Sequence, residues 1–377
     1  MVRFVHTADW QLGLRRHFLD PDAQARFTDA RLDAVRRIGE LAEREGCAFV
    51  TVAGDVFEDN HVERRVVWRA LEAMESIPVP VYLLPGNHDP LNAGSIYRSG
   101  DFSTHAPANV TVLDTWEPVP AGDGVEILAA PWSSKRPLED LCAAVIDGAS
   151  DPDPGTTRIL VAHGIVDTLS PDPMNPAQIA VEALDRALGD GRVQFVGLGD
   201  RHSTTEVGAS GRVWYAGAPE ATGFDESDPG NALVVDLHGG RCEVEAHRIG
   251  SWRFLDEGFA LDGDEDVDIV RDWLARVPDP KRAIVRVSFV GTLSLRGRAA
   301  LDRILDDASE VFGALQTWER HTDLAVLADD ADVTDLGLAG FARDAVDALS
   351  GRVAEDPGDE AAGDALRLLH RLAGAGG

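Results

Sequence analysis

AFVTVAGDVFE (residues 48–58) is the stretch that decides the fold, because an apolar, β-branched run leads directly into Gly54 and the carboxylate of Asp55. Runs of this kind, bounded by Gly or Pro, are typical of buried strands. The same order, an apolar run followed by polar side chains, recurs in four other segments. They are VRFVHTADWQ (2–11), VPVYLLPGNHD (79–89), RILVAHG (158–164) and VQFVGLGDRH (193–202).

The polar side chains after these strands are candidate metal ligands. In open α/β sheets, ligands bind at the edge where the carboxyl ends of the strands meet. Asp55 is expected to bridge two divalent ions, because a carboxylate after a Gly at a strand end can reach both. The full set of expected ligands is Asp9, Gln11, Asp55, Asn87, His163, Asp200 and His202.

Three further residues are predicted to take part in the chemistry. His88 follows the expected ligand Asn87, and we expect Asp89 to pair with it and hold its imidazole protonated. Such a cation can stabilise charge on a phosphorane or protonate a leaving alkoxide. Glu58 follows Asp55 by three residues and is expected to position water or substrate; the alternative is a helix N-terminal carboxylate.

The formal charge of −30 argues against a protein that simply coats nucleic acid, since such proteins are usually basic. Acidic residues cluster in loops such as 151–157 and 225–230, which we interpret as solvated surface. A nucleic-acid substrate would therefore be met by a partner protein or by a local basic rim. The candidates for that rim are Arg15, Arg16, Arg64 and Arg65.

The compartment is predicted from the N-terminus and the cysteines. The chain enters a strand at once, without a basic leader or a long apolar stretch, which predicts neither a signal peptide nor a membrane span. Its three cysteines are far apart and match no zinc spacing. We therefore expect reduced thiols in a cytoplasmic protein.

Residues 1–250 alternate strand-like and helix-like segments and then change to strands with short turns, which predicts a layered α/β sandwich with two sheets. The helices are expected at 22–45, 62–76, 137–147 and 178–188. Residues 253–320 read as a small α/β domain of their own, and 335–377 as a helical segment that is a possible docking region for a partner. Helices are expected there at 335–349 and 359–373.

The ordered motifs carry a family resemblance. HTADWQLG (6–13), AGDVFEDN (53–60), LPGNHDP (84–90), VAHGIVD (161–167) and GLGDRHS (197–203), followed by VWYAGAPE (213–220), resemble those of calcineurin-like metallophosphoesterases. Within that group they are most similar to the nuclease subunit of SbcCD-type DNA-repair complexes. The likeness is specific over residues 1–250 and looser over 253–320.

The resemblance implies an α/β fold: a four-layered αββα sandwich with a small α/β capping domain and C-terminal helices. It implies two divalent metal ions of the Mn²⁺ type, with Mg²⁺ as the alternative, and hydrolysis of phosphodiester bonds in DNA as an exonuclease or endonuclease. It further implies work in DNA repair or recombination with an SMC-like coiled-coil ATPase subunit, dimerisation, and a capping domain that orients DNA.

Two positions depart from the family pattern. Gln11 stands where the family usually has His, and Asp200 stands where its GH-x-H motif has the first His. Both changes move the site toward oxygen ligands, which suits Mn²⁺ or Mg²⁺ better than softer ions. Two alternatives remain open at this point: a phosphodiesterase or phosphatase for small molecules, and a catalytically weak scaffold of the ATPase complex.

Overall fold

The structure is a computed structural model that describes residues 1–327, 341–356, 359, 361–362 and 365–366. The chain divides into two compact units. One comprises Met1–His17 and Gln24–Trp252, and the other comprises Phe18–Ala23 and the described residues from Arg253 onward. Among the described helices, none combines the length and the apolar character needed to cross a membrane.

The first sheet of the first unit has six strands in the order β12-β11-β1-β2-β3-β4. The strands from β1 to β4 run parallel, and β11 pairs antiparallel with both β1 and β12. The strands are β1 (Val2–Thr7), β2 (Val50–Ala53), β3 (Val81–Leu84), β4 (Val110–Val112), β11 (Asn231–His238) and β12 (Arg241–Arg248).

The second sheet also has six strands, in the order β5-β6-β7-β8-β10-β9. Its four central strands are parallel, and the two edge strands pair antiparallel with their neighbours. The strands are β5 (Val119–Gly122), β6 (Val125–Ala130), β7 (Thr157–His163), β8 (Phe195–Gly199), β9 (Thr205–Glu206) and β10 (Val213–Tyr215).

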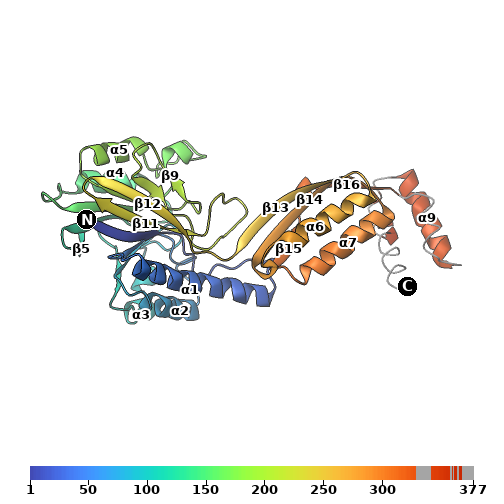
Figure 1. Ribbon diagram of the computed structural model, residues 1–377, viewed down its shortest axis with the longest axis horizontal. Coiled ribbons are helices and arrows are strands. Elements are labelled where there is room, and N and C mark those ends of the chain that lie inside the picture. Colours follow the sequence, from blue (N-terminus) through green and yellow to red (C-terminus); the bar gives the residue numbers. More distant parts are fainter. Residues whose placement is uncertain (328–340, 357–358, 360, 363–364, 367–377) are drawn as a thin grey trace. The chain divides into compact units, whose positions relative to one another are not determined.

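The two sheets pack face to face between two layers of helices (Figure 1). Helices α1 (Pro21–Arg44) and α2 (Arg64–Glu75) pack on the outer face of the first sheet. Helices α4 (Leu141–Gly148) and α5 (Val181–Gly189) cover the second. The short α3 (Gly100–Ser103) lies beside α2. The predicted four-layered αββα sandwich is thereby confirmed.

A buried histidine joins the two sheets beneath the ends of their strands. His6 of β1 shares a hydrogen bond of 3.0 Å with the hydroxyl of Thr51 on β2, and its Nε2 lies 3.4 Å from the carbonyl oxygen of Leu198 on β8. A Cβ on Gly197 would lie only 2.5 Å from the His6 ring, so only glycine allows this approach. The close approach brings the carboxyl ends of both sheets together.

The second unit is built around a parallel sheet in the order β13-β14-β15, with β16 pairing the far half of β14. Its helices α6 and α7 pack on this sheet around a core of their own. The elements are β13 (Arg253–Leu261), α6 (Val267–Arg276), β14 (Ala283–Ser294), α7 (Leu295–Ser309), β15 (Ala314–Thr317), β16 (Asp323–Leu327) and α9 (Phe341–Glu355). Most of the helix expected at 359–373 lies outside the described residues.

Candidate metal centre

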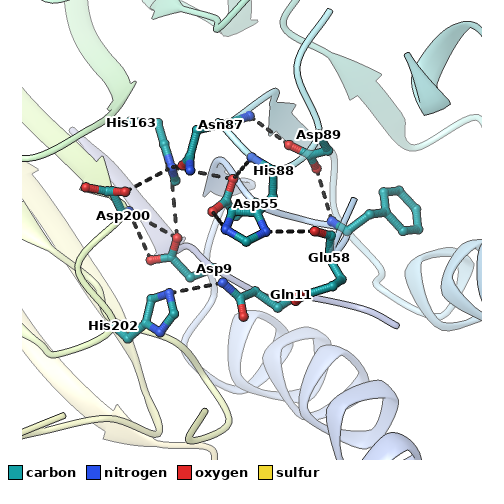
Figure 2. Close-up of polar contacts among 12 residues, drawn as sticks. Asp9, Gln11, Asp55, Glu58, Asn87, His88, Asp89, His163, Asp200 and His202 are labelled. Atoms are coloured by element: carbon teal, nitrogen blue, oxygen red, sulfur yellow. Dashed lines mark hydrogen bonds and ion pairs between the residues drawn. The ribbon is translucent and has the colours of Figure 1, made fainter. Parts of the chain in front are cut away.

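The polar segments expected to form a site follow five parallel strands, and they meet where the two sheets come together. Strands β1, β2 and β3 contribute from the first sheet, and β7 and β8 from the second. Figure 2 shows the side chains from both sheets converging on one place. The residues brought together are Asp9, Gln11, Asp55, Glu58, Asn87, His88, His163, Asp200 and His202.

The centre of the site is a buried cluster of Asp9, Asp55 and His163. One ligand atom from each of these residues lies within 4.8 Å of the others, and no side chain among the three is more than 3 % exposed. In the described chain, no Lys or Arg forms an ion pair with Asp9, Asp55 or Asp200. Buried carboxylates of this kind are stable when they are paired or coordinate a metal, so the donor set fits a divalent cation.

His163 presents one particular nitrogen to the cluster. Its Nδ1 donates to the carbonyl oxygen of Ala53 at 2.8 Å, so Nε2 is the nitrogen that a metal can bind in place of a proton. Nε2 lies 2.6 Å from Oδ1 of Asn87, 3.5 Å from Oδ1 of Asp55 and 3.7 Å from Oδ1 of Asp200. Three other predicted ligands, Asn87, Asp55 and Asp200, therefore lie around Nε2 of His163 (Figure 2).

The backbone at the site takes conformations that L-residues rarely adopt. Asp9, Gln11, Asp55 and Asp200 all have positive φ angles, of 53°, 44°, 52° and 93°. Such conformations cost on the order of 1–3 kcal/mol each and persist only where the surroundings enforce them. Here the amide of Asp9 donates to Gly54 and that of Gln11 to Asp55, which holds the two loops together.

Glycines next to the ligands give the loops the space they need. A Cβ on Gly54 would lie 2.1 Å from Nδ1 of His163, and one on Gly86 would lie 2.2 Å from Oδ1 of Asp55. Real Cβ atoms do not come so close to neighbouring atoms. Gly54 and Gly86 therefore allow the chain to turn and also leave space for the candidate ligands to pack against the backbone.

The charges of the cluster are only partly balanced. Burial raises the pKa of Asp9 to about 7 and also raises the pKa of Asp200. Burial opposes ionisation of Asp55 as well, but His163 and His88 hold its pKa below the usual value. The same carboxylates raise the pKa of His163 well above its usual value, against the effect of burial. A bound cation would replace this proton and balance the remaining negative charge.

Gln11 and His202 lie together on the Asp9 side of the cluster (Figure 2). The amide nitrogen of Gln11 is 3.1 Å from Nε2 of His202. On the other side of the ring, Nδ1 donates to Oε1 of Glu226 at 3.0 Å and lies 2.7 Å from the hydroxyl of Thr222. These contacts fix the ring with Nε2 toward the site.

The sequence did not identify Glu226 as part of the site. It belongs to the acidic loop 225–230 that we interpreted as solvated surface, yet its side chain is 8 % exposed and bonded to His202 and Thr222. It lies well inside the loop that follows β10 and not at the end of a strand, so the pattern that found the other residues did not apply. The only signal was a carboxylate close in sequence to the last motif.

His88 stands at the open side of the cluster, with its side chain 38 % exposed. Its backbone amide donates to Oδ1 of Asp55 at 2.9 Å, and its Nε2 lies 4.0 Å from Oδ2 of the same residue. Nδ1 donates to the carbonyl oxygen of Glu58 at 2.7 Å. This bond fixes the ring and directs Nε2 toward the place where a substrate would approach.

Asp89 does not orient His88, which corrects the expected pairing. The Asp89 side chain is fully buried and accepts hydrogen bonds from the amides of Gly86 and Phe57 and from the hydroxyl of Tyr97, at 2.8, 3.0 and 2.6 Å. Burial raises its pKa to about 6. Asp89 therefore braces the PGNHD loop, while a backbone carbonyl orients the histidine.

Glu58 contributes more through its backbone than was expected. Its carbonyl holds His88, and its amide donates to Leu12 at 3.1 Å. The side-chain atom Oε2 is buried and makes no hydrogen bond, and burial raises the pKa of the carboxyl group. That Glu58 positions water or substrate remains a prediction.

The solved structures that are similar to this chain include two phosphatases. A dimetal phosphatase from Danio rerio is 13% identical, with a TM-score of 0.42 over 66% of this chain and 96% of that one. A purple acid phosphatase from yellow lupin (Lupinus luteus) seeds is 13% identical, with a TM-score of 0.42 over 66% of this chain and 51% of that one. No curated protein matches.

The family model described as calcineurin-like phosphoesterase matches residues 2–203. That span contains the whole buried cluster of Asp9, Asp55 and His163. The chain therefore belongs to the calcineurin-like phosphoesterase family, and the family together with this cluster indicates a metal-dependent hydrolase.

Proposed function

We propose that this protein is a metal-dependent nuclease that hydrolyses phosphodiester bonds in DNA. The observation that carries the proposal is a half-exposed imidazole, His88, held by a backbone carbonyl beside a buried set of metal-type ligands. That arrangement supports phosphoester hydrolysis. The choice of DNA rests on the resemblance of the ordered motifs to those of SbcCD-type nuclease subunits.

Two divalent ions would be held by Asp9, Asp55, Asn87, His163 and Asp200, with His202 and Gln11 on the outer side. Carboxylate and amide oxygens dominate this set, which favours Mn²⁺, with Mg²⁺ as the alternative. When bound, the ions would neutralise phosphate charge and lower the pKa of a water molecule to near neutrality.

The chain's own residues would handle the leaving group. Nδ1 of His88 already donates to Glu58, so a protonated ring carries its second proton on Nε2, which faces the open side of the cluster. That proton can stabilise the charge on the phosphate or pass to the departing 3′-oxygen. Asn87 adds a ligand oxygen without negative charge, so it does not repel the phosphate.

So acidic a chain needs a partner protein to bind DNA. At a net charge of −30, long-range attraction to DNA is not available from the protein as a whole. We propose that an SMC-like coiled-coil ATPase subunit supplies most of it, with the second unit orienting the strand and the 335–377 segment docking the partner. Dimerisation of the nuclease is part of the same proposal.

The test is hydrolysis by the purified chain of labelled single- and double-stranded DNA and of bis-p-nitrophenyl phosphate, in titrations of Mn²⁺ and Mg²⁺. We expect cleavage that requires metal and that falls about 10²–10⁴-fold in His88→Ala. His238→Ala, an exposed histidine at the end of β11, is the matched control and should leave the rate unchanged.

The other outcomes separate the alternatives. Hydrolysis of the small diester with DNA left intact, both alone and with the ATPase subunit, would favour a small-molecule phosphoesterase. No turnover of either substrate, together with no stoichiometric metal, would favour a scaffold and overturn the proposal.

A further inference from the structure

A cavity opens beside the metal centre on the side of His202. Its volume is about 330 Å³, and its lining includes Arg16, Arg201, His202, Thr222 and Glu226. His202 is shared between this cavity and the metal centre, because its ring also contacts Gln11. A group bound in the cavity would thus lie next to a substrate at the metals.

The two arginines of the cavity are not held in ion pairs by described carboxylates, although the charge of Arg16 acts to lower the pKa of Glu58. Neither Arg16 nor Arg201 forms an ion pair with any carboxylate in the described part of the chain. Arg16 donates from Nη2 to the carbonyl oxygen of Thr222, and its Nε is buried without a partner. Arg201 donates from Nε to the hydroxyl of Thr205 at 2.9 Å, and its two Nη groups make no hydrogen bond with described residues.

Two of the other arginines of the predicted basic rim are paired, whereas Arg65 forms no ion pair with a described carboxylate. Arg15 pairs with Glu63 at 3.7 Å, and Arg64 pairs with Asp101 at 2.7 Å. What sets Arg16 and Arg201 apart is that both line one cavity and neither forms an ion pair with a described carboxylate. Their charges are available for an anion from outside the chain.

The two acidic residues that line the cavity form no ion pair with these arginines. Glu226 accepts hydrogen bonds from His202 and from the amide and hydroxyl of Thr222, so its oxygens are already engaged. Asp225, the other acidic residue of the lining, is exposed. No Phe, Tyr or Trp of the described chain lines the cavity, so it offers no surface for stacking a base.

We infer that this cavity binds a second phosphate of the substrate, the one next to the scissile phosphate along a nucleic-acid strand. The inference rests on the proposed nuclease function and narrows its substrate class to strands with adjacent phosphates. Guanidinium groups suit this role because they hold phosphate oxygens through two parallel N–H bonds. Diesters with a single phosphate cannot use the cavity.

The test compares thymidine dinucleotides that differ only in a terminal phosphate. The plain dinucleotide has one internal phosphate, and its 5′- and 3′-phosphorylated forms add a second on either side. Using the full-length protein with Mn²⁺, we expect kcat/KM to be about tenfold higher for one phosphorylated form than for the plain one. The preferred form also tells which direction the strand takes.

Arg201→Gln and Arg16→Gln should each remove most of this preference, measured as the ratio of the two kcat/KM values. The ratio is the readout, because a variant that only disturbs the neighbouring metal ligands would lower both rates alike. Arg186→Gln is the matched control: it removes one positive charge from an exposed arginine of α5 that does not line the cavity, and the ratio should stay as in the wild type.

The remaining outcomes distinguish failure of the cavity assignment from failure of the nuclease proposal. Equal rates for all three dinucleotides in the wild type, or a preference that survives in both variants, would overturn the cavity assignment while leaving the nuclease proposal intact. No turnover of any dinucleotide while labelled DNA is still cleaved would overturn the cavity assignment alone. If labelled DNA also stays intact, with and without the ATPase subunit, and bis-p-nitrophenyl phosphate is still hydrolysed, the nuclease proposal falls and the assignment with it.

Discussion

The two sides of the metal centre are built in different ways. On the inner side, Asp9, Asp55 and His163 lie at the end of a buried strand or two residues beyond it, and neighbouring backbone holds them. On the outer side, His202 depends on Glu226, which comes from a loop between β10 and β11 without regular structure. Strand ends thus fix the position of the inner ligands, whereas the outer side depends on contacts between side chains.

The largest expected effect is on the inner side. Asp55→Asn removes a charge that faces His163 and the open side of the cluster, so we expect at least about a 10³-fold loss of metal-dependent hydrolysis of bis-p-nitrophenyl phosphate. The metal content of the purified variant should fall in parallel. Asp123→Asn, in an exposed turn, should change neither quantity, and normal activity in Asp55→Asn would contradict the inner-side assignment.

The close packing of the Gly54 backbone against His163 can be tested without changing any charge on the inner side. Gly54→Ala puts a Cβ within 2.1 Å of His163 at a residue with a φ of +88°, so we expect a loss of about 3–4 kcal/mol in the free energy of unfolding. Gly46→Ala carries a similar φ of +65° but meets nothing within 4 Å, and should cost about 1 kcal/mol. Urea denaturation measures the free energy of unfolding of both variants. Equal losses would show that the positive φ alone, and not the contact with His163, causes the cost.

The contact between the two sheets beneath the cluster predicts a pH dependence. Burial lowers the pKa of His6 from 6.5 to about 4, so the folded protein keeps this ring neutral. The stability that this provides is complete above pH 6.5 and is lost as the pH falls toward 4, by about 3 kcal/mol in total. In His6→Gln, the free energy of unfolding should depend less steeply on pH over that range. If the pH dependence is unchanged, groups other than His6 cause it.

The inner side and the fold around it could be predicted from the sequence, because both obey local rules. An apolar run followed by a polar residue marks the end of a buried strand, so five such runs predicted five strands of the two sheets and the candidate ligands at their ends. The four predicted helices of the first unit lie within a few residues of α1, α2, α4 and α5. Ligands and strands are adjacent in the sequence, which makes their pattern visible.

The contacts that orient the two histidines could not be predicted, for two physical reasons. His88 is held by the carbonyl of Glu58, and a backbone carbonyl leaves no mark on residue type. Glu226 meets His202 only because the loop folds back across 24 positions of the chain, and an acidic loop otherwise looks like solvated surface. Asp89 was assigned to His88 because they are neighbours in sequence, whereas its carboxylate points into the PGNHD loop.

The smallest expected effect tests whether the outer side holds metal at all. Glu226→Gln keeps an acceptor for Nδ1 of His202 but removes the charge, and loss of such a partner lowers metal affinity about 10-fold or somewhat more. The measurement is calorimetric titration of chelator-treated protein with Mn²⁺, without substrate. Asp228→Asn, an exposed carboxylate of the same loop, should bind like the wild type. If Glu226→Gln also binds like the wild type, His202 and its loop serve the substrate cavity alone, and the metals depend entirely on the inner strand ends.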